Sequence, residues 1–143
     1  MSAAGRGTTE RLPGRFAVRE REAVDDGWPD TPREEAGAEA TVCRPERART
    51  VVTRNDSPDI PFNRSINPYR GCEHGCIYCY ARPSHAYLDL SPGLDFEQQI
   101  VCKENVAERL TEELAAPGYV CEPVLLGANT DPYQPVERRL RLL

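Results

Sequence analysis

The sequence predicts an α/β fold that begins near residue 61, and three consecutive segments indicate it. "FEQQIVCK" (96–103) ends in a short apolar run that is typical of a strand. "ENVAERLTEELAAPG" (104–118) has the apolar period of a helix. "EPVLLGANTDP" (122–132) contains the uninterrupted apolar run of a strand that is buried on both faces. Strand, helix and strand in this order are the start of an α/β unit.

Two shorter elements are expected ahead of this unit. "NRSINPY" (63–69) has an isoleucine among turn-forming residues, which favours a short strand that leads into a loop. "SHAYLDL" (84–90) is long enough for one or two turns of helix, and "SPG" (91–93) stops it.

The predicted helix has clear signals at both ends. Val106, Leu110 and Leu114 recur every four residues on one face, which Ala107 broadens. Asn105 is placed to cap the first turn, and a Pro-Gly pair ends the helix.

A further helix is expected to open at Pro135, because proline suits the first helical turn. "PVERRLRLL" then runs to Leu143 without a capping signal. A parallel strand pair with an exposed edge does not make a stable domain. We therefore expect the chain to be cut short inside a larger α/β sheet or barrel.

Residues 1–60 are expected to form a disordered tail, and residues 61–143 the folded domain. Gly, Pro, Ala, Arg and Glu dominate the first segment, and its large apolar residues follow no period. The alternative is an arm that docks on the domain through "TVCRPERARTVVTRN" (41–55), in which Cys43 is an unpaired structural thiol.

The net charge of −5 and the pI near 5.1 give no electrostatic signature of nucleic-acid binding. The sequence has no apolar run long enough for a membrane span, and its N-terminus lacks the apolar core of a secretory signal. We expect a cytoplasmic protein, in which clustered cysteines are metal ligands or catalytic groups rather than disulfides.

Three cysteines, Cys72, Cys76 and Cys79, lie within "INPYRGCEHGCIYCYARP" (66–83). On a helix they would form a buried thiol stripe. Gly71 and Gly75 argue against a helix, because each glycine costs it about 1 kcal/mol relative to alanine. Glycines instead let the backbone curl, so that the three side chains converge.

Structural zinc is one candidate for this cluster. Zinc prefers four Cys and His ligands, and His74 or His85 is available as a fourth. No second Cys-x2-Cys pair follows, however, and His74 lies inside the loop itself.

A 4Fe-4S cluster is the other candidate, since thiolates are its usual ligands. Three thiolates hold three irons and leave the fourth iron open to a molecule that is not protein. Cys102 or Cys121 would close that position, but both lie in strand-like segments where core packing explains them.

At these residues the chain resembles the radical S-adenosylmethionine (SAM) superfamily. Cys72-x3-Cys76-x2-Cys79 is similar to its signature, with the aromatic Tyr78 ahead of the last cysteine. "YRGCEHGCIYCYAR" and "NTDPYQPVE" resemble the bacterial subgroup related to spore photoproduct lyase. The resemblance covers roughly residues 60 to 143 and implies the N-terminal portion of a partial (β/α) TIM-type radical SAM barrel, in a truncated chain.

The resemblance also implies an activity. In that family a 4Fe-4S cluster reductively cleaves SAM to methionine and a 5′-deoxyadenosyl radical, which takes hydrogen from a substrate. It implies a lyase-like enzyme whose partners are SAM and an electron donor such as flavodoxin or ferredoxin. Nucleic acid is a partner by analogy only, and no membrane is expected.

Carried onto this chain, the resemblance makes Cys72, Cys76 and Cys79 the cluster ligands. It places Tyr78 against the adenine, the alternative being core packing behind the loop.

The family commonly has a Gly-Gly-Glu-like segment that receives the methionine amino group. Here Asn129, Thr130 and Asp131 stand in its place, and each offers an oxygen that accepts from an ammonium. The alternative is that this segment caps the next helix. Arg70 and Arg82 flank the loop and are expected either to offset the negative charge of the cluster or of a carboxylate, or to be solvated.

Two other functions stay open from sequence. One is a metal-binding module without catalysis, which holds either zinc or an electron-transfer cluster. The other is an inactive fragment that retains the cluster loop.

Overall fold

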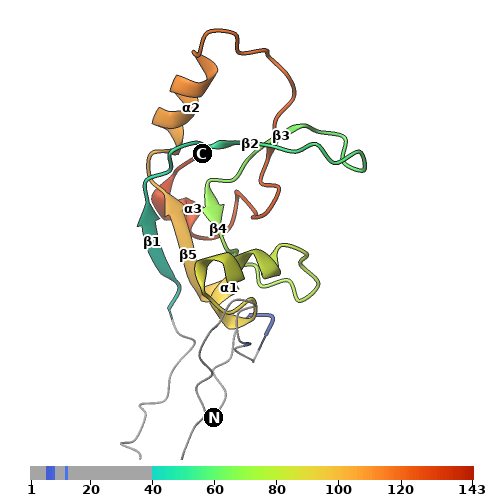
Figure 1. The fold of residues 1–143 in the computed structure, drawn as a ribbon. Helices are drawn as coiled ribbons and strands as arrows, with labels where there is room; N and C mark the ends of the chain where they lie inside the picture. The colour runs from blue at the N-terminus through green and yellow to red at the C-terminus, as the bar shows by residue number, and fades with distance from the viewer. Residues whose placement is uncertain (1–5, 9–11, 13–39) are drawn as a thin grey trace, which may run out of the picture.

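The computed structural model describes residues 6–8, 12 and 40–143 as a mixed α/β fold with two three-stranded sheets (Figure 1). The first sheet has the order β1 (Val42–Glu46), β5 (Gln99–Lys103), β4 (Tyr69–Arg70). The second has the order β2 (Val52–Arg54), β3 (Arg64–Ile66), β6 (Leu125–Leu126). The helices are η1 (Arg82–Leu88), α1 (Leu94–Gln98), α2 (Val106–Leu114) and α3 (Glu137–Leu140). Among the described residues the sheets do not close into a barrel, and no helix has the length and apolar content to cross a membrane.

Part of the expected tail is integrated into the sheets. β1 pairs in parallel with β5, with Cys43 opposite Ile100, and β2 pairs antiparallel with β3. Residues 42–54 thus follow the alternative of a docked arm rather than that of a disordered tail. The apolar period missed this because β1 is an edge strand that is held by backbone hydrogen bonds and has mostly exposed side chains. Most of residues 1–39 lie outside the described residues.

The strand–helix–strand prediction is right in order and wrong in pairing. β5 confirms the strand at 99–103, while residues 96–98 belong to α1. β6 pairs in parallel with β3, not with β5. Leu125 and Leu126 are exposed, so the prediction of a strand buried on both faces is wrong. The cause is position, because β6 is the edge of its sheet.

Helix α2 confirms the clearest sequence signal and corrects its details. Val106 is buried and Leu110 packs beside it, whereas Leu114 is exposed. Asn105 precedes the helix, but its side chain makes no capping bond. The Asn105 amide instead accepts from the backbone N of Ala48 at 2.8 Å and donates to its carbonyl at 2.9 Å. The residue therefore fixes the β1–β2 connection against α2.

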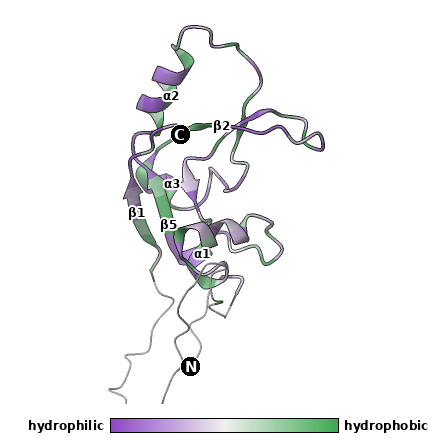
Figure 2. Cartoon of the chain, viewed as in Figure 1, coloured by the Kyte–Doolittle hydropathy of each residue, from purple (hydrophilic) through white to green (hydrophobic). Residues whose placement is uncertain are grey.

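The core consists of small clusters on the two sheets, and Figure 2 shows the apolar middle of β5 beside the mostly hydrophilic β1. One cluster lies under α2 and includes Val51 and Ile66. A second gathers Tyr69, Ile100 and Cys102. The second cluster confirms the prediction that core packing explains Cys102.

His85 is wholly buried on η1. Its Nε2 lies 3.0 Å from the carbonyl oxygen of Gln99, and its ring meets Phe96 edge-on at 5.4 Å between centroids. Burial lowers the pKa of His85, as does the Arg44 charge, while the Gln99 carbonyl and Asp95 oppose the shift. The imidazole is therefore held neutral.

This burial predicts acid sensitivity. A histidine whose folded pKa is depressed takes up its proton preferentially in the unfolded chain, so stability is full above the unfolded pKa of about 6.5 and falls as the pH drops below it. Urea unfolding at pH 7.5 and 5.5 is expected to show this loss, and His85→Gln to reduce it. His74→Gln, at the exposed histidine, is the matched control and should keep the loss. An unchanged pH dependence in His85→Gln would contradict the assignment.

Candidate functional site

The cysteine cluster lies on a loop of turns, not on a helix. Residues 71–81 have no helical segment, which rules out the thiol stripe. Cys72 is buried against Ala81 and Phe96, and Cys79 packs on the same cluster. Cys76 is exposed. All six cysteines of the chain are free thiols.

The two glycines of the loop take the backbone conformation that the sequence predicted for them. Gly71 has φ +85° and Gly75 has φ +67°, a backbone region that residues other than glycine rarely adopt. A Cβ on Gly71 would lie 2.9 Å from the carbonyl oxygen of Phe96 and 3.0 Å from Ile100. The reversal at Gly71 thus allows close contact between the loop and the core.

Gly71→Ala is therefore expected to destabilise the chain by about 1–3 kcal/mol from backbone strain alone, and further through the contacts with Phe96 and Ile100. Gly118→Ala is the matched control, because Gly118 has φ +81° and nothing within 4 Å of its Cβ position. Urea denaturation of both variants measures the difference. Equal losses would contradict a steric role for Gly71.

Arg82 holds the loop from its inner side. Its Nε donates to the carbonyl of Cys76 at 2.9 Å, and one terminal nitrogen donates to the carbonyl of Gly93 at 3.0 Å. The other terminal nitrogen bonds a carboxylate oxygen of Glu97 at 2.6 Å. The guanidinium also lies over the ring of Phe96, at 5.3 Å from its centroid. Arg82 is buried and its charge is matched by Glu97, so the expectation that it is solvated is wrong.

Arg70, the other flanking arginine, is exposed and pairs with Glu46 at 3.1 Å. The two arginines therefore have different roles. Arg82 fixes the loop, while Arg70 stands at the side of the first sheet.

The second sequence motif, residues 127–137, lies directly against the cysteine loop. Thr130 Oγ1 donates to the carbonyl of Gly71 at 2.7 Å. The wholly buried Gln134 accepts from the backbone N of Glu73 at 2.9 Å and donates to Thr130 Oγ1 at 3.2 Å. The Tyr80 hydroxyl donates to the carbonyl of Ala128. Segments about fifty residues apart in sequence form one unit.

The sheet explains this proximity. β3 and β6 are parallel neighbours, with Ile66 opposite Leu126. The second motif follows β6 directly, and the cysteine loop follows β3 after the two-residue strand β4 of the other sheet, so both motifs lie beyond the carboxyl ends of the β3–β6 pair. Ligands of parallel α/β folds bind beyond the carboxyl ends of strands.

The Cys72 thiol is the point where the two motifs meet. Burial raises its pKa, and hydrogen bonds from the backbone amides of His74 and Asp131 act against that shift. Backbone donors to a cysteine sulfur stabilise the thiolate and tune a bound cluster. The second motif thus reaches a predicted ligand through Asp131.

The residues predicted to contact SAM differ in their exposure and in their hydrogen bonds. Tyr78 is 86% exposed, so core packing behind the loop is wrong for it. Asn129 is exposed and its backbone N donates to Asn67. Thr130 is buried with its hydroxyl engaged, which makes it a positioning residue.

Asp131 remains exposed, with one carboxylate oxygen accepting from the Tyr133 amide at 2.8 Å and the other 3.2 Å from His74 Nε2. The helix-capping alternative for this segment is wrong. α3 starts at Glu137 and has no side-chain cap.

Of the four candidates for a fourth ligand, His74 lies in the loop and pairs with Asp131, and the other three lie elsewhere. His85 is bonded to Gln99, and Cys102 lies in the core. Cys121 is exposed and belongs to the connection between α2 and β6, at the opposite end of the molecule from η1 and α1 (Figure 1). The prediction that core packing explains Cys121 is wrong. Within the described residues, no three His, Cys, Asp or Glu side chains are gathered around a point that one metal ion would fill.

Sequence reasoning missed three supporting residues, Glu73, Glu97 and Gln134. Glu97 carries no local signal, because its partner Arg82 lies fifteen residues away. Gln134 sits within "NTDPYQPVE", and the resemblance marked that motif without assigning the glutamine a role. Arg6 also reaches the loop, with its guanidinium donating to the carbonyl of Glu73 at 2.8 Å.

No family model matches this chain, and no solved structure does. Among curated proteins, the uncharacterized proteins Rv2578c of Mycobacterium tuberculosis and Mb2609c of Mycobacterium bovis are each 54% identical to it over 84 residues. The match covers 59% of this chain and 25% of each relative. The chain therefore spans about a quarter of the length of the curated relatives it matches.

Proposed function

We propose that this chain is the cluster-binding part of a radical SAM enzyme, in which Cys72, Cys76 and Cys79 bind a 4Fe-4S cluster. The observation that carries the proposal is the meeting of two motifs beyond adjacent parallel strands, β3 and β6. A cluster with an open iron needs both motifs. The cysteine loop would hold the cluster, and the second motif would position the molecule that binds the open iron.

The donor set fits a cluster better than a single ion. A tetrahedral zinc site needs four ligands around one point, and the described residues have no group of even three. A cubane instead takes one thiolate at each iron, so the three sulfurs need only face a common volume. Cys72, Cys76 and Cys79 are free thiols of one loop, and such thiols are the usual ligands of this cluster.

The residues of the chain have distinct tasks in this proposal. Arg82 and the two glycines hold the loop, and the amides of His74 and Asp131 donate to the Cys72 sulfur. Thr130 positions the second motif. Asn129 and Asp131 are exposed, and their side-chain oxygens are proposed to accept from the ammonium of a methionine group, in Asp131 beside the bonds to Tyr133 and His74. Tyr78 presents an open face for an adenine.

When bound, the cluster supplies the electron that cleaves SAM reductively. The chain contributes position and local electrostatics to that chemistry. We further propose a (β/α) barrel fold for the whole enzyme and a cytoplasmic location. Its partner would be an electron donor of the flavodoxin or ferredoxin kind. The substrate class rests on analogy with spore photoproduct lyase and is not assigned.

Addition of SAM to the reconstituted, reduced chain tests the proposal. The EPR spectrum of the reduced cluster is expected to change, because the amino and carboxylate groups of SAM become ligands of one iron. Adenosine lacks the amino and carboxylate groups, so it is the comparison ligand and should leave the spectrum unchanged. Zinc in the purified chain, or a cluster spectrum indifferent to SAM, would favour a non-catalytic metal module.

A further inference from the structure

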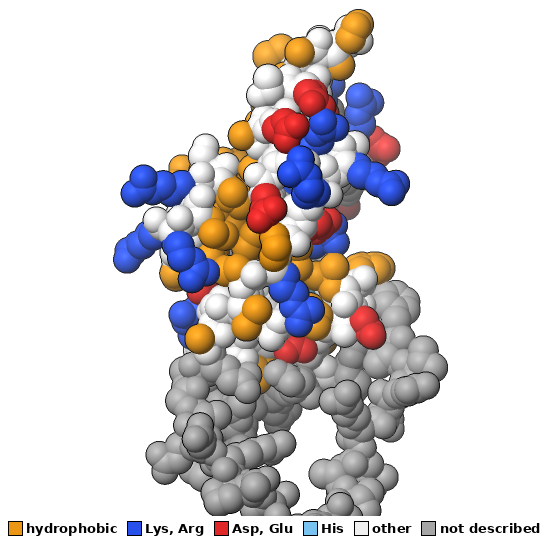
Figure 3. Space-filling view, turned by 90° about the vertical axis from the view of Figure 1, so that its left-hand side faces the viewer, with side chains coloured by type: hydrophobic (Ala, Val, Ile, Leu, Met, Phe, Trp, Pro, Cys, Tyr) orange, Lys and Arg blue, Asp and Glu red, His pale blue; other side chains and the backbone are white. Residues whose placement is uncertain are grey.

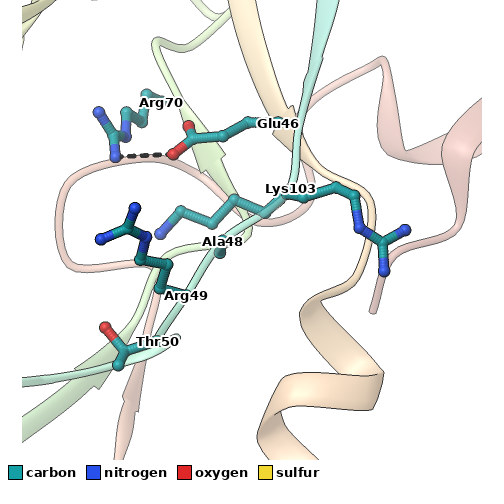
Figure 4. Close-up of a pocket in the computed structure, with 7 residues that line it drawn as sticks. Glu46, Ala48, Arg49, Thr50, Arg70 and Lys103 are labelled. Atoms are coloured by element: carbon teal, nitrogen blue, oxygen red, sulfur yellow. Dashed lines mark hydrogen bonds and ion pairs between the residues drawn. The ribbon is translucent and has the colours of Figure 1, made fainter.

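A second site lies at the first sheet, where a pocket of about 330 Å³ opens between three segments (Figure 4). It is lined by the end of β1 and the following connection, by β4 and by the end of β5. The lining residues are Glu46, Arg47, Ala48, Arg49, Thr50, Arg70 and Lys103. No cysteine lines it, and neither does any residue of the second motif.

Lys103 is the unusual member of this pocket. The residue is only 8% exposed, which is rare for a lysine unless its charge is paired. Among the described residues, its ammonium makes no hydrogen bond and no ion pair, although its backbone N donates to the carbonyl of Pro68. Burial is the first cause that lowers its pKa, and the Arg70 charge adds to the effect. An unpaired buried ammonium is unfavourable, so the pocket favours a negative ligand.

The carboxylates near Lys103 are already engaged. Glu46 pairs with Arg70 at 3.1 Å. Glu113 accepts from the backbone N of Val51 at 2.6 Å and from that of Val52 at 3.1 Å. Both carboxylates attract the Lys103 charge from a distance, but neither neutralises it by contact.

Arg49 adds a second uncompensated charge. Arg49 lines the same pocket as Lys103, and Figure 4 shows the two side chains extending in the same direction. Arg49 is exposed and has no ion pair with the described residues. Arg47 also lines the pocket, but its charge is already paired with Glu108 at 3.4 Å, so it does not add to the charge available to a ligand. Three cations, Arg49, Arg70 and Lys103, therefore face one carboxylate, that of Glu46.

We propose that this pocket binds the phosphate group of a small phosphate monoester. A phosphate monoester carries close to two negative charges at neutral pH, which matches the excess of two cations over Glu46. Arginine forks and lysine ammonium groups are the usual side-chain partners of phosphate oxygens. The volume lies at the lower end of the range for small-molecule sites, which fits a phosphate with a short substituent.

The surface outside the pocket also carries charge of both signs. On the face drawn in Figure 3, acidic side chains lie among the basic ones. A general electrostatic attraction of anions to this acidic chain is not expected. Binding at the pocket does not require the cluster, so it is tested on the cluster-free chain and its outcome is separate from that of the proposed function.

Titration calorimetry of the cluster-free chain with glycerol 3-phosphate, inorganic phosphate and acetate tests the proposal. Glycerol 3-phosphate is expected to bind more tightly than acetate by at least tenfold, with inorganic phosphate close to it. Arg49→Gln and Lys103→Met are each expected to lower the affinity for glycerol 3-phosphate at least tenfold. Arg54→Gln, at an exposed arginine on β2 outside the pocket, is the matched control and should bind as the unchanged chain does.

Equal binding of acetate and phosphate, or equal weakening by Arg54→Gln, would overturn the proposal in favour of general surface charge. Binding to phosphatidic acid vesicles without binding of glycerol 3-phosphate would also overturn it, because the phosphate groups bound would then be those of a lipid surface and not of a small molecule. Arg49 is exposed, so its variant keeps the fold and remains decisive if Lys103→Met unfolds. Circular dichroism of each variant checks the fold.

Discussion

Cys76→Ala is expected to abolish assembly of a 4Fe-4S cluster in this chain, although it leaves the fold intact. Cys76 is exposed, so its replacement removes a thiolate without opening a cavity. Two thiolates hold a cubane poorly, since each coordinated iron takes one protein ligand. After anaerobic reconstitution, the unchanged chain should contain about four irons and four sulfides, and the variant close to none.

Cys121→Ala is the matched control, because Cys121 is equally an exposed free thiol but lies on the connection between α2 and β6. It should assemble the cluster fully. Cys102→Ala also leaves the three loop thiols in place, although it removes a core side chain and some stability. Loss of the cluster in Cys121→Ala or in a folded Cys102→Ala would show a fourth protein ligand, and would contradict the open iron.

Arg82→Gln is expected to lower the free energy of unfolding by about 3–5 kcal/mol, the cost of breaking a buried ion pair from one side. The change leaves the carboxylate of Glu97, which is only 1% exposed, without its cation. It also frees the carbonyls of Cys76 and Gly93, which accept from Arg82. The cysteine loop should loosen together with the core.

Arg70→Gln is the control, since Arg70 also flanks the loop and makes a single exposed ion pair. Such a pair contributes about 0–1 kcal/mol. Urea denaturation of both variants, with far-UV circular dichroism as the probe, measures the two losses. A loss in Arg82→Gln no larger than that in Arg70→Gln would contradict the role of Arg82 in holding the cysteine loop. The double variant Arg82→Gln/Glu97→Gln should recover part of the loss, because no buried charge is then left unpaired.

The sequence predicted those parts of the fold whose physics is local. The φ values of Gly71 and Gly75 follow from the need for tight turns, and α2 follows from its apolar period. Asn105 was placed correctly ahead of the helix but given the wrong partner. A cap is a local bond, whereas the bond to Ala48 spans fifty-seven residues and leaves no trace in the neighbouring sequence.

The failures concern long-range pairing. β1 is an edge strand without an apolar period, and it joins the sheet through backbone hydrogen bonds that its side-chain pattern does not predict. Leu125 and Leu126 have the composition of a buried strand, yet they lie at an exposed edge. An apolar composition makes burial of a strand favourable, but the segments packed beside the strand decide whether it is buried.

For the candidate site, the sequence identified the metal loop and the second motif but not the contacts that join them. Thr130 was treated as a ligand contact, and its hydroxyl instead bonds the carbonyl of Gly71. The ion pair of Arg82 and Glu97 could not be predicted from sequence, because an arginine beside a metal loop can equally be exposed to solvent. Lys103 and Arg49 line one pocket because β1 and β5 pair in parallel, with Glu46 opposite Lys103.

Electron–nuclear double resonance of the reduced, reconstituted chain with SAM labelled with ¹⁵N at its amino group tests the open iron most directly. We expect a ¹⁵N coupling that is absent with unlabelled SAM, which would place the amino nitrogen on the iron that Cys72, Cys76 and Cys79 do not bind. A cluster that assembles fully and shows no such coupling, with its fourth iron bound by a side chain of the chain, would contradict the proposed chemistry.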